Sequence, residues 1–126
     1  MTGFFLNDDY WQVKLVPANS PVLVDEYGVL TLGVTDAAER CVYLSSSLGR
    51  DARIKVLLHE IGHCVIFSYG LRDEIQRLVK KRYWKEAEER ICNFVADYGM
   101  VIFRSAYQAL GKEVWTYIAQ KLEVMF

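Results

Sequence analysis

The first 45 residues alternate between short apolar runs and turn residues, which is the pattern of a small β-sheet. Runs rich in β-branched and aromatic residues, each bounded by turn residues, predict strands near 22–24, 29–34 and 40–45. A further short strand is expected over Trp11–Val16, where apolar and polar residues alternate until Pro17 stops the run. We therefore expect a small antiparallel sheet of about three strands in the N-terminal part of the chain.

Beyond residue 50 the apolar residues recur at intervals of three and four, which is the period of amphipathic helices. Gly70 and Gly111 are placed where a helix commonly ends in the left-handed conformation. Together these signals predict four helices, over Arg50–Tyr69, Leu71–Lys81, Trp84–Leu110 and Lys112–Val124. Strands first and helices afterwards predict the α+β class, with the sheet followed by a bundle of about four helices.

Composition narrows the class of protein. At 126 residues the chain can build one sizeable core but not two, so we expect one domain over residues 1–126. A net charge of -1 gives no reason to expect nucleic acid or an anionic membrane as a partner. The chain starts without a leader pattern and has no apolar run of membrane-spanning length, so we expect a cytoplasmic protein. An odd number of cysteines, without CxxC spacing, predicts reduced thiols: Cys41, Cys64 and Cys92.

The apolar run of residues 57–67 contains His-Glu-x-x-His, and its two histidines are the only ones in the chain. Residues four apart share one face of a helix, so His59 and His63 can meet at one metal ion. Glu60 points in a neighbouring direction, where it can act as the general base on a metal-bound water. The alternative is a core helix with satisfied histidines, but burying two imidazoles and a carboxylate is costly. The motif therefore predicts a zinc site.

Two histidines need a third protein ligand, and here it has to be a carboxylate from a later helix. Glu89 is the favoured candidate, because its helix face continues through small or hydrogen-bonding residues that let two helices approach closely. Glu86 is the next candidate, and Glu88 is expected to face solvent. Asn93, one turn beyond Glu89, is expected to hydrogen-bond a ligating histidine. Gly62 costs about 1 kcal/mol in a helix, which predicts that another backbone or the substrate approaches it closely.

Three segments together resemble the ImmA/IrrE family of small bacterial and phage metallopeptidase domains. Residues 42–47 read VYLSSS, residues 57–63 read LLHEIGH, and residues 89–96 read ERICNFVA. The family has a strand, an AHELGH helix and a downstream E-x-x-A-N-x-F-A helix; here Cys92 replaces the alanine and Val95 the phenylalanine. The resemblance implies a zincin-like fold with the motif on the first helix. It also implies His59, His63 and Glu89 as zinc ligands and Glu60 as the catalytic base.

The resulting hypothesis is a zinc-dependent metallopeptidase that hydrolyses a peptide bond of a protein or peptide substrate. By resemblance, the substrate is a repressor-type regulatory protein of a phage or mobile element. We expect the substrate to pair with an edge strand near Val42–Ser45, with Tyr69 and Tyr98 as nominees for oxyanion stabilisation. The main alternative is a catalytically weak or inactive zinc-binding module that binds a repressor or host protein without cleaving it. A two-histidine-one-carboxylate iron oxygenase is a weaker alternative.

Overall fold

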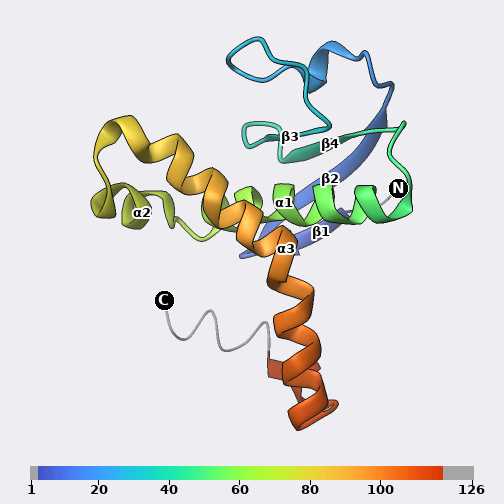
Figure 1. The fold of residues 1–126 in the computed structure, drawn as a ribbon, viewed down its shortest axis with the longest axis vertical. Coiled ribbons are helices and arrows are strands. Elements are labelled where there is room, and N and C mark those ends of the chain that lie inside the picture. Colours follow the sequence, from blue (N-terminus) through green and yellow to red (C-terminus); the bar gives the residue numbers. More distant parts are fainter. Residues whose placement is uncertain (1–2, 118–126) are drawn as a thin grey trace.

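The computed structural model describes residues 3–117 and belongs to the α+β class (Figure 1). Four strands and a short helical turn come first, and the helices follow. The elements, in chain order, are β1 (Gly3–Leu6), β2 (Asp9–Val16), η1 (Pro21–Leu23), β3 (Gly33–Asp36), β4 (Cys41–Ser45), α1 (Arg50–Ser68), α2 (Arg72–Leu78), η2 (Lys81–Tyr83) and α3 (Trp84–Leu110).

The four strands form a mixed sheet in the order β1-β2-β4-β3, so the expected antiparallel sheet of about three strands is present in part: it has four strands, and one of its pairings is parallel. β2 and β4 pair in parallel, whereas β1 with β2 and β3 with β4 are antiparallel. The parallel pair arises because the long segment between β2 and β4 carries the chain back to the same end of the sheet. β1 had not been predicted. The turn at Asn7 and Asp8 joins it to β2, and both residues have positive φ, as two-residue hairpin loops require.

Two of the expected strands fall differently in the structure. The strand near 22–24 is replaced by the 3₁₀ turn η1, in which Ser20 caps the first turn and Pro21 supplies a fixed φ. The strand near 29–34 begins only at Gly33, because the residues before it form a separate hairpin that touches itself at the Val24–Leu30 bridge. The runs over 11–16 and 40–45 do form strands, namely β2 and β4.

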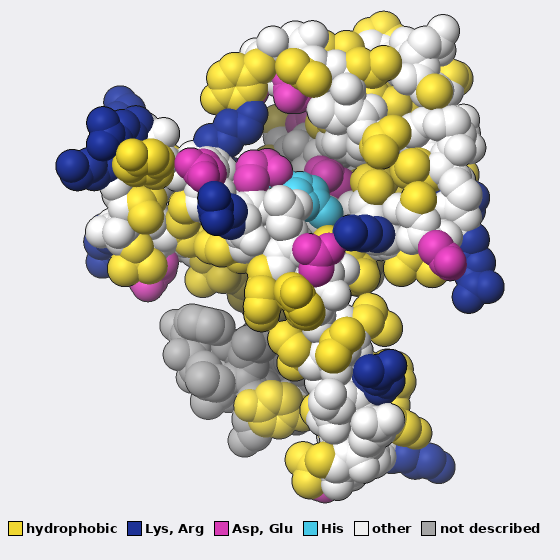
Figure 2. All heavy atoms as spheres, in the orientation of Figure 1, with side chains coloured by type: hydrophobic (Ala, Val, Ile, Leu, Met, Phe, Trp, Pro, Cys, Tyr) yellow, Lys and Arg dark blue, Asp and Glu magenta, His cyan; other side chains and the backbone are white. Residues whose placement is uncertain are grey.

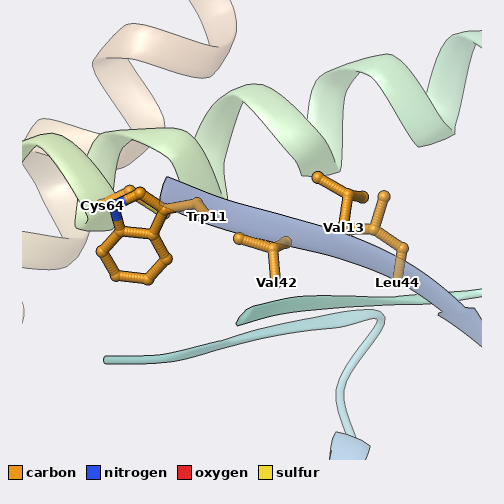
Figure 3. Close-up of a cluster of buried hydrophobic side chains, with 5 residues drawn as sticks. All are labelled: Trp11, Val13, Val42, Leu44 and Cys64. Carbon is orange, nitrogen blue, oxygen red and sulfur yellow. The ribbon is translucent and has the colours of Figure 1, made fainter. Parts of the chain in front are cut away.

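One face of the sheet packs against α1, and the core lies between them (Figure 3). Trp11 and Val13 of β2, Val42 and Leu44 of β4, and Cys64 of α1 form its buried cluster. The indole N–H of Trp11 donates a hydrogen bond to Ser68 Oγ at 2.9 Å, so the C-terminal end of α1 is tied to β2. All three cysteines are free and buried, as expected for core residues.

The helices largely follow the predicted boundaries. α1 and α3 match their predicted ranges to within one residue, and Gly70 and Gly111 both have positive φ. α2 is shorter than predicted, and η2 leads from it into α3. Of the last predicted helix, residues 113–117 are helical and the rest lies outside the described residues. α3 crosses α1, and its second half projects past the rest of the molecule (Figure 1).

Within residues 3–117, no single helix has the length and apolar character needed to cross a membrane. Only α1 and α2 taken together reach that length and composition, and they are bent by 95° relative to each other.

Candidate metal centre

The two motif histidines lie side by side on the face of α1 that α3 crosses. Their ring centroids are 5.0 Å apart, and the Nε2 atoms of His59 and His63 approach to 3.3 Å. Both side chains are mostly buried, with 18% and 15% of their surface exposed. The helical spacing that predicted a shared face therefore brings both Nε2 atoms to a common point.

Glu89 of α3 closes this group from the opposite side. One carboxylate oxygen lies 3.1 Å from His59 Nε2 and the other lies 3.0 Å from His63 Nε2. The three side chains offer ligand atoms within 4.8 Å of one another, which is a spacing that could hold a metal ion. Glu86, the other candidate, is exposed and accepts a hydrogen bond from Arg90 at 3.0 Å instead. The geometry thus selects Glu89 over Glu86.

A close contact between the helices explains why Glu89 reaches the histidines. Gly62 lies between them on α1, and a Cβ atom placed on it would sit 3.2 Å from Cys92 Cα and 3.0 Å from Cys92 Sγ. A side chain at this position would make unusually tight contacts with Cys92, so the absence of one in glycine favours this approach. The expected close approach of another backbone at Gly62 is confirmed, and Glu89 lies one turn before the contact on α3.

Glu60 lies beside the histidines and is buried, with 6% of its surface exposed. Its Oε2 is 3.8 Å from His59 Nε2, while its Oε1 accepts a 2.9 Å hydrogen bond from Thr35 Oγ1 of β3. Burial raises the pKa of the Glu60 carboxyl, and the Thr35 hydrogen bond opposes that rise. Thr35 was not predicted as a site residue, because its partner is 25 positions away in the sequence.

Glu88 was expected to face solvent, and that expectation was wrong. The Nδ1–H of His63 donates a 2.6 Å hydrogen bond to Glu88 Oε2, and Arg72 Nε donates to Glu88 Oε1 at 3.3 Å. Asn93 was expected in this role, but it is exposed and lines the cleft in front of the site. The difference arises because Nδ1 of His63 faces Glu88, the residue directly before Glu89, and not Asn93 one turn beyond it.

The two histidines and the two glutamates lie close enough to shift one another's pKa values. The hydrogen bond to Glu89 raises the pKa of His59. Burial alone would lower the pKa of His63, but contacts with Cys92, Glu88 and Glu89 outweigh it and raise that pKa to about 12. Hydrogen bonds to His59 and His63 lower the pKa of Glu89, and the hydrogen bond to His63 lowers the pKa of Glu88. A metal ion would therefore meet ionised carboxylates but would have to displace protons from the imidazoles.

A cleft of about 1010 Å³ opens in front of these residues. Figure 2 shows a histidine in this hollow, with acidic side chains beside it. One wall comes from residues 24–26 and 31–35, the floor from α1, and the other wall from α2 and the first half of α3. Among the described residues, neither Tyr69 nor Tyr98 lines this cleft, so the structure does not bring these oxyanion nominees to the site.

The edge strand beside the cleft is β3, so the expectation that Val42–Ser45 forms the edge was wrong. β4 pairs with β2 on one side and β3 on the other, which leaves it no free hydrogen-bonding edge. β3 pairs with β4 alone and lies next to Glu60 through Thr35. The chain does lead from β4 directly into α1, but position along the chain does not fix position in the sheet.

Comparisons with known proteins leave the chain without an assigned family. No protein-family model, curated protein or solved structure matches it. The resemblance to the ImmA/IrrE family therefore rests on the three short segments alone.

Proposed function

We propose that this protein is a zinc-dependent metallopeptidase. The observation that carries the proposal is the convergence of His59 Nε2, His63 Nε2 and the Glu89 carboxylate at one point, with Glu60 beside them. Two imidazoles and one carboxylate are a common protein ligand set for catalytic zinc, which leaves a fourth position open. A purely structural zinc site would instead close that position with a fourth protein ligand.

The donor set suits zinc in number and chemistry, and its spacing could hold a metal ion. When bound, zinc would polarise the scissile carbonyl and make a water molecule acidic enough to attack at neutral pH. Glu88 holds the Nδ1–H of His63 and so fixes the ring with Nε2 facing Glu89. Carboxylate partners of this kind set the tautomer and orientation of metal-ligating histidines.

Glu60 is the residue we assign to proton transfer. Its carboxylate faces the same cleft, and burial shifts its pKa upward, toward the range in which a general base works near neutral pH. Glu60 takes the proton of the attacking water and passes it to the leaving amine. Thr35 holds the other carboxylate oxygen and thereby limits the rotation of the side chain.

The free edge of β3 is where we place the substrate main chain. An extended polypeptide can add to an exposed sheet edge by main-chain hydrogen bonds, and β3 runs along the cleft beside Glu60. The substrate class is therefore a protein or peptide. The resemblance to the ImmA/IrrE family adds a zincin-like fold and a repressor-type substrate of a phage or mobile element to the proposal.

The experiment that tests the proposal compares the native protein with Glu60→Gln after both have been loaded with zinc. Hydrolysis of a quenched peptide library should fall by about 100-fold or more in the variant, because general-base catalysis contributes that much. Zinc content and melting temperature should stay unchanged. Glu39→Gln, at an exposed position away from the cleft, is the control and should retain full activity. Equal hydrolysis by native protein and Glu60→Gln would contradict the assignment.

The same variant separates the peptidase from the alternative of a zinc-binding interaction module. A module that acts by binding would keep its biological effect in Glu60→Gln, because neither the fold nor the zinc ligands change. The burial of a carboxylate that faces the cleft without being needed for the ligand set favours the peptidase.

A further inference from the structure

A hydrogen-bonded hairpin, residues 22–32, lies at the rim of the cleft and leads into β3. The Asp25 carboxylate accepts hydrogen bonds from the backbone N–H groups of Tyr27 at 2.9 Å and Val29 at 3.0 Å. The backbone N–H of Asp25 also donates to the carbonyl of Val29 at 2.9 Å, and Thr31 Oγ1 donates to the carbonyl of Leu23 at 2.7 Å. Leu23 itself is fully buried and anchors the base of the hairpin to the sheet. The hairpin is therefore a defined element.

This hairpin turns its apolar side chains outward. Val24, Val29, Leu30 and Leu32 have between 42% and 56% of their surface exposed, although Leu23 beside them is buried. Figure 2 shows hydrophobic side chains gathered over this part of the molecule, at the top of the view. Contiguous exposed apolar side chains on a rigid element are typical of a binding surface.

The apolar surface continues directly into the candidate metal centre. Val24 and Leu32 line the cleft together with His59, Glu60 and Glu89. Leu32 immediately precedes Gly33, the first residue of β3, so the hairpin and the free edge of that strand form one uninterrupted wall.

One residue of α3 connects the two walls of the cleft. Lys85 Nζ lies 3.5 Å from the centre of the Tyr27 ring and 3.7 Å from Glu26 Oε1. These contacts hold the tip of the hairpin against α3, one turn before Glu89. The tip of the hairpin therefore contacts the same helix that carries the candidate ligand Glu89.

We propose that the hairpin of residues 22–32 is the docking surface for the apolar side chains of an extended polypeptide whose main chain runs along β3. This inference rests on the proposed function for the identity of its occupant. Alternate side chains of an extended chain lie on one side, roughly 7 Å apart. The sequence recognised therefore carries apolar residues at alternate positions, placed against Leu30, Leu32 and Val24.

The test measures peptide binding without catalysis. Zinc-loaded Glu60→Gln protein is titrated into two fluorescein-labelled decapeptides of equal charge, one with leucine and one with serine at alternate positions. Fluorescence anisotropy should show the leucine peptide binding at least about tenfold more tightly. When Leu30→Ser and Leu32→Ser are introduced together into the Glu60→Gln protein, the preference for the leucine peptide should disappear. Zinc content and melting temperature should stay the same. Leu78→Ser, which alters a leucine that is 82% exposed on α2 and away from the cleft, is the control and should keep it.

Three results would overturn the inference: binding of neither peptide, equal binding of both, or a preference that survives in the Leu30→Ser, Leu32→Ser variant. Sedimentation of the native chain and of this variant tests whether a second copy of the chain occupies the surface. A native dimer that dissociates in the variant would assign the surface to that second copy and would also overturn the inference. None of these results depends on hydrolysis. Loss of the docking surface and loss of the proposed peptidase activity would therefore be distinguished.

Discussion

Glu88 and Glu89 are neighbours in the sequence, yet each contacts the imidazoles in a different way. Glu89 faces the Nε2 atoms of both histidines, whereas Glu88 holds Nδ1 of His63 and is itself held by Arg72. The first arrangement is that of a ligand and the second that of a residue that orients a ligand. This difference leads to separate expectations for the two side chains.

Replacing Glu88 by Gln should weaken zinc binding by about 10–100-fold, which is the usual cost of losing such a partner. The amide removes the negative charge that holds the Nδ1–H of His63 and so lowers the basicity of Nε2. Competition with a coloured chelator measures the affinity. Glu86→Gln changes a glutamate two positions before Glu88 that pairs with Arg90 and has no contact with the histidines among residues 3–117, and it should leave the affinity unchanged. If the two variants bound zinc equally well, the orienting role would be wrong.

The pH dependence of zinc binding follows from the two histidines. The folded-state pKa values of His59 and His63 lie above the ordinary 6.5, so their protonated forms stabilise the metal-free protein. That stabilisation is complete below about pH 6.5 and is lost as the pH rises through the folded-state values. Zinc has to displace these protons, so its affinity should rise by about tenfold per pH unit for each proton released. Chelator competition between about pH 6 and pH 8 measures it; a flat profile would contradict the coupling.

Much of the site could be predicted residue by residue, because helical spacing is a local property. His59, Glu60 and His63 followed from the motif alone, and Glu89 followed from the small residues on its face. The role of Glu88 could not be predicted. Adjacent residues on a helix point about 100° apart, and the sequence of α3 alone does not show how deeply His63 reaches toward it.

Among the contacts between secondary-structure elements, the site depends most on the contact of α1 with α3 at Gly62. Gly62→Ala would place a methyl group 3.2 Å from Cys92 Cα, so the backbone of α3 at Cys92 would have to shift by a few tenths of an ångström. Overpacking costs about 1–3 kcal/mol, and alanine regains about 1 kcal/mol of helix propensity, so we expect a net loss of up to about 2 kcal/mol in the free energy of unfolding. Zinc binding should weaken as well, because Glu89 moves with α3.

Urea unfolding and chelator competition measure these two effects. Gly99→Ala is the matched control, because a Cβ there meets only Val95 at 3.7 Å. It should stabilise the helix by up to about 1 kcal/mol and leave zinc binding unaffected. Unchanged zinc affinity in Gly62→Ala would show that the approach of the helices does not position Glu89.

The strands were less predictable than the helices. Their pairing depends on partners that are distant in the sequence, and a run of apolar residues does not reveal its neighbours. β4 was correctly located at 40–45, yet its central place in the sheet, and the parallel pairing with β2, could not be read from its own residues. The hairpin of residues 22–32 was read as two strands because its outward-facing valines and leucines have the composition of a buried sheet.

At the scale of the whole molecule, the proposed site combines parts from three layers. The sheet contributes Thr35 and the free edge of β3, α1 contributes the histidines and Glu60, and α3 contributes Glu89 and Glu88. Trp11 and Ser68 tie α1 to the sheet, while the Gly62 contact ties α3 to α1. The ligand set therefore exists only in the folded chain, and bound metal should stabilise the fold.

The most direct test of this account is the zinc content per chain, measured by mass spectrometry after purification without added metal. The native protein should hold one zinc ion per chain. Glu89→Ala should lose it on dialysis, and Glu86→Ala should retain it. A native chain that takes up no zinc, even when zinc is supplied at neutral pH, would contradict the metal centre and with it the proposed peptidase.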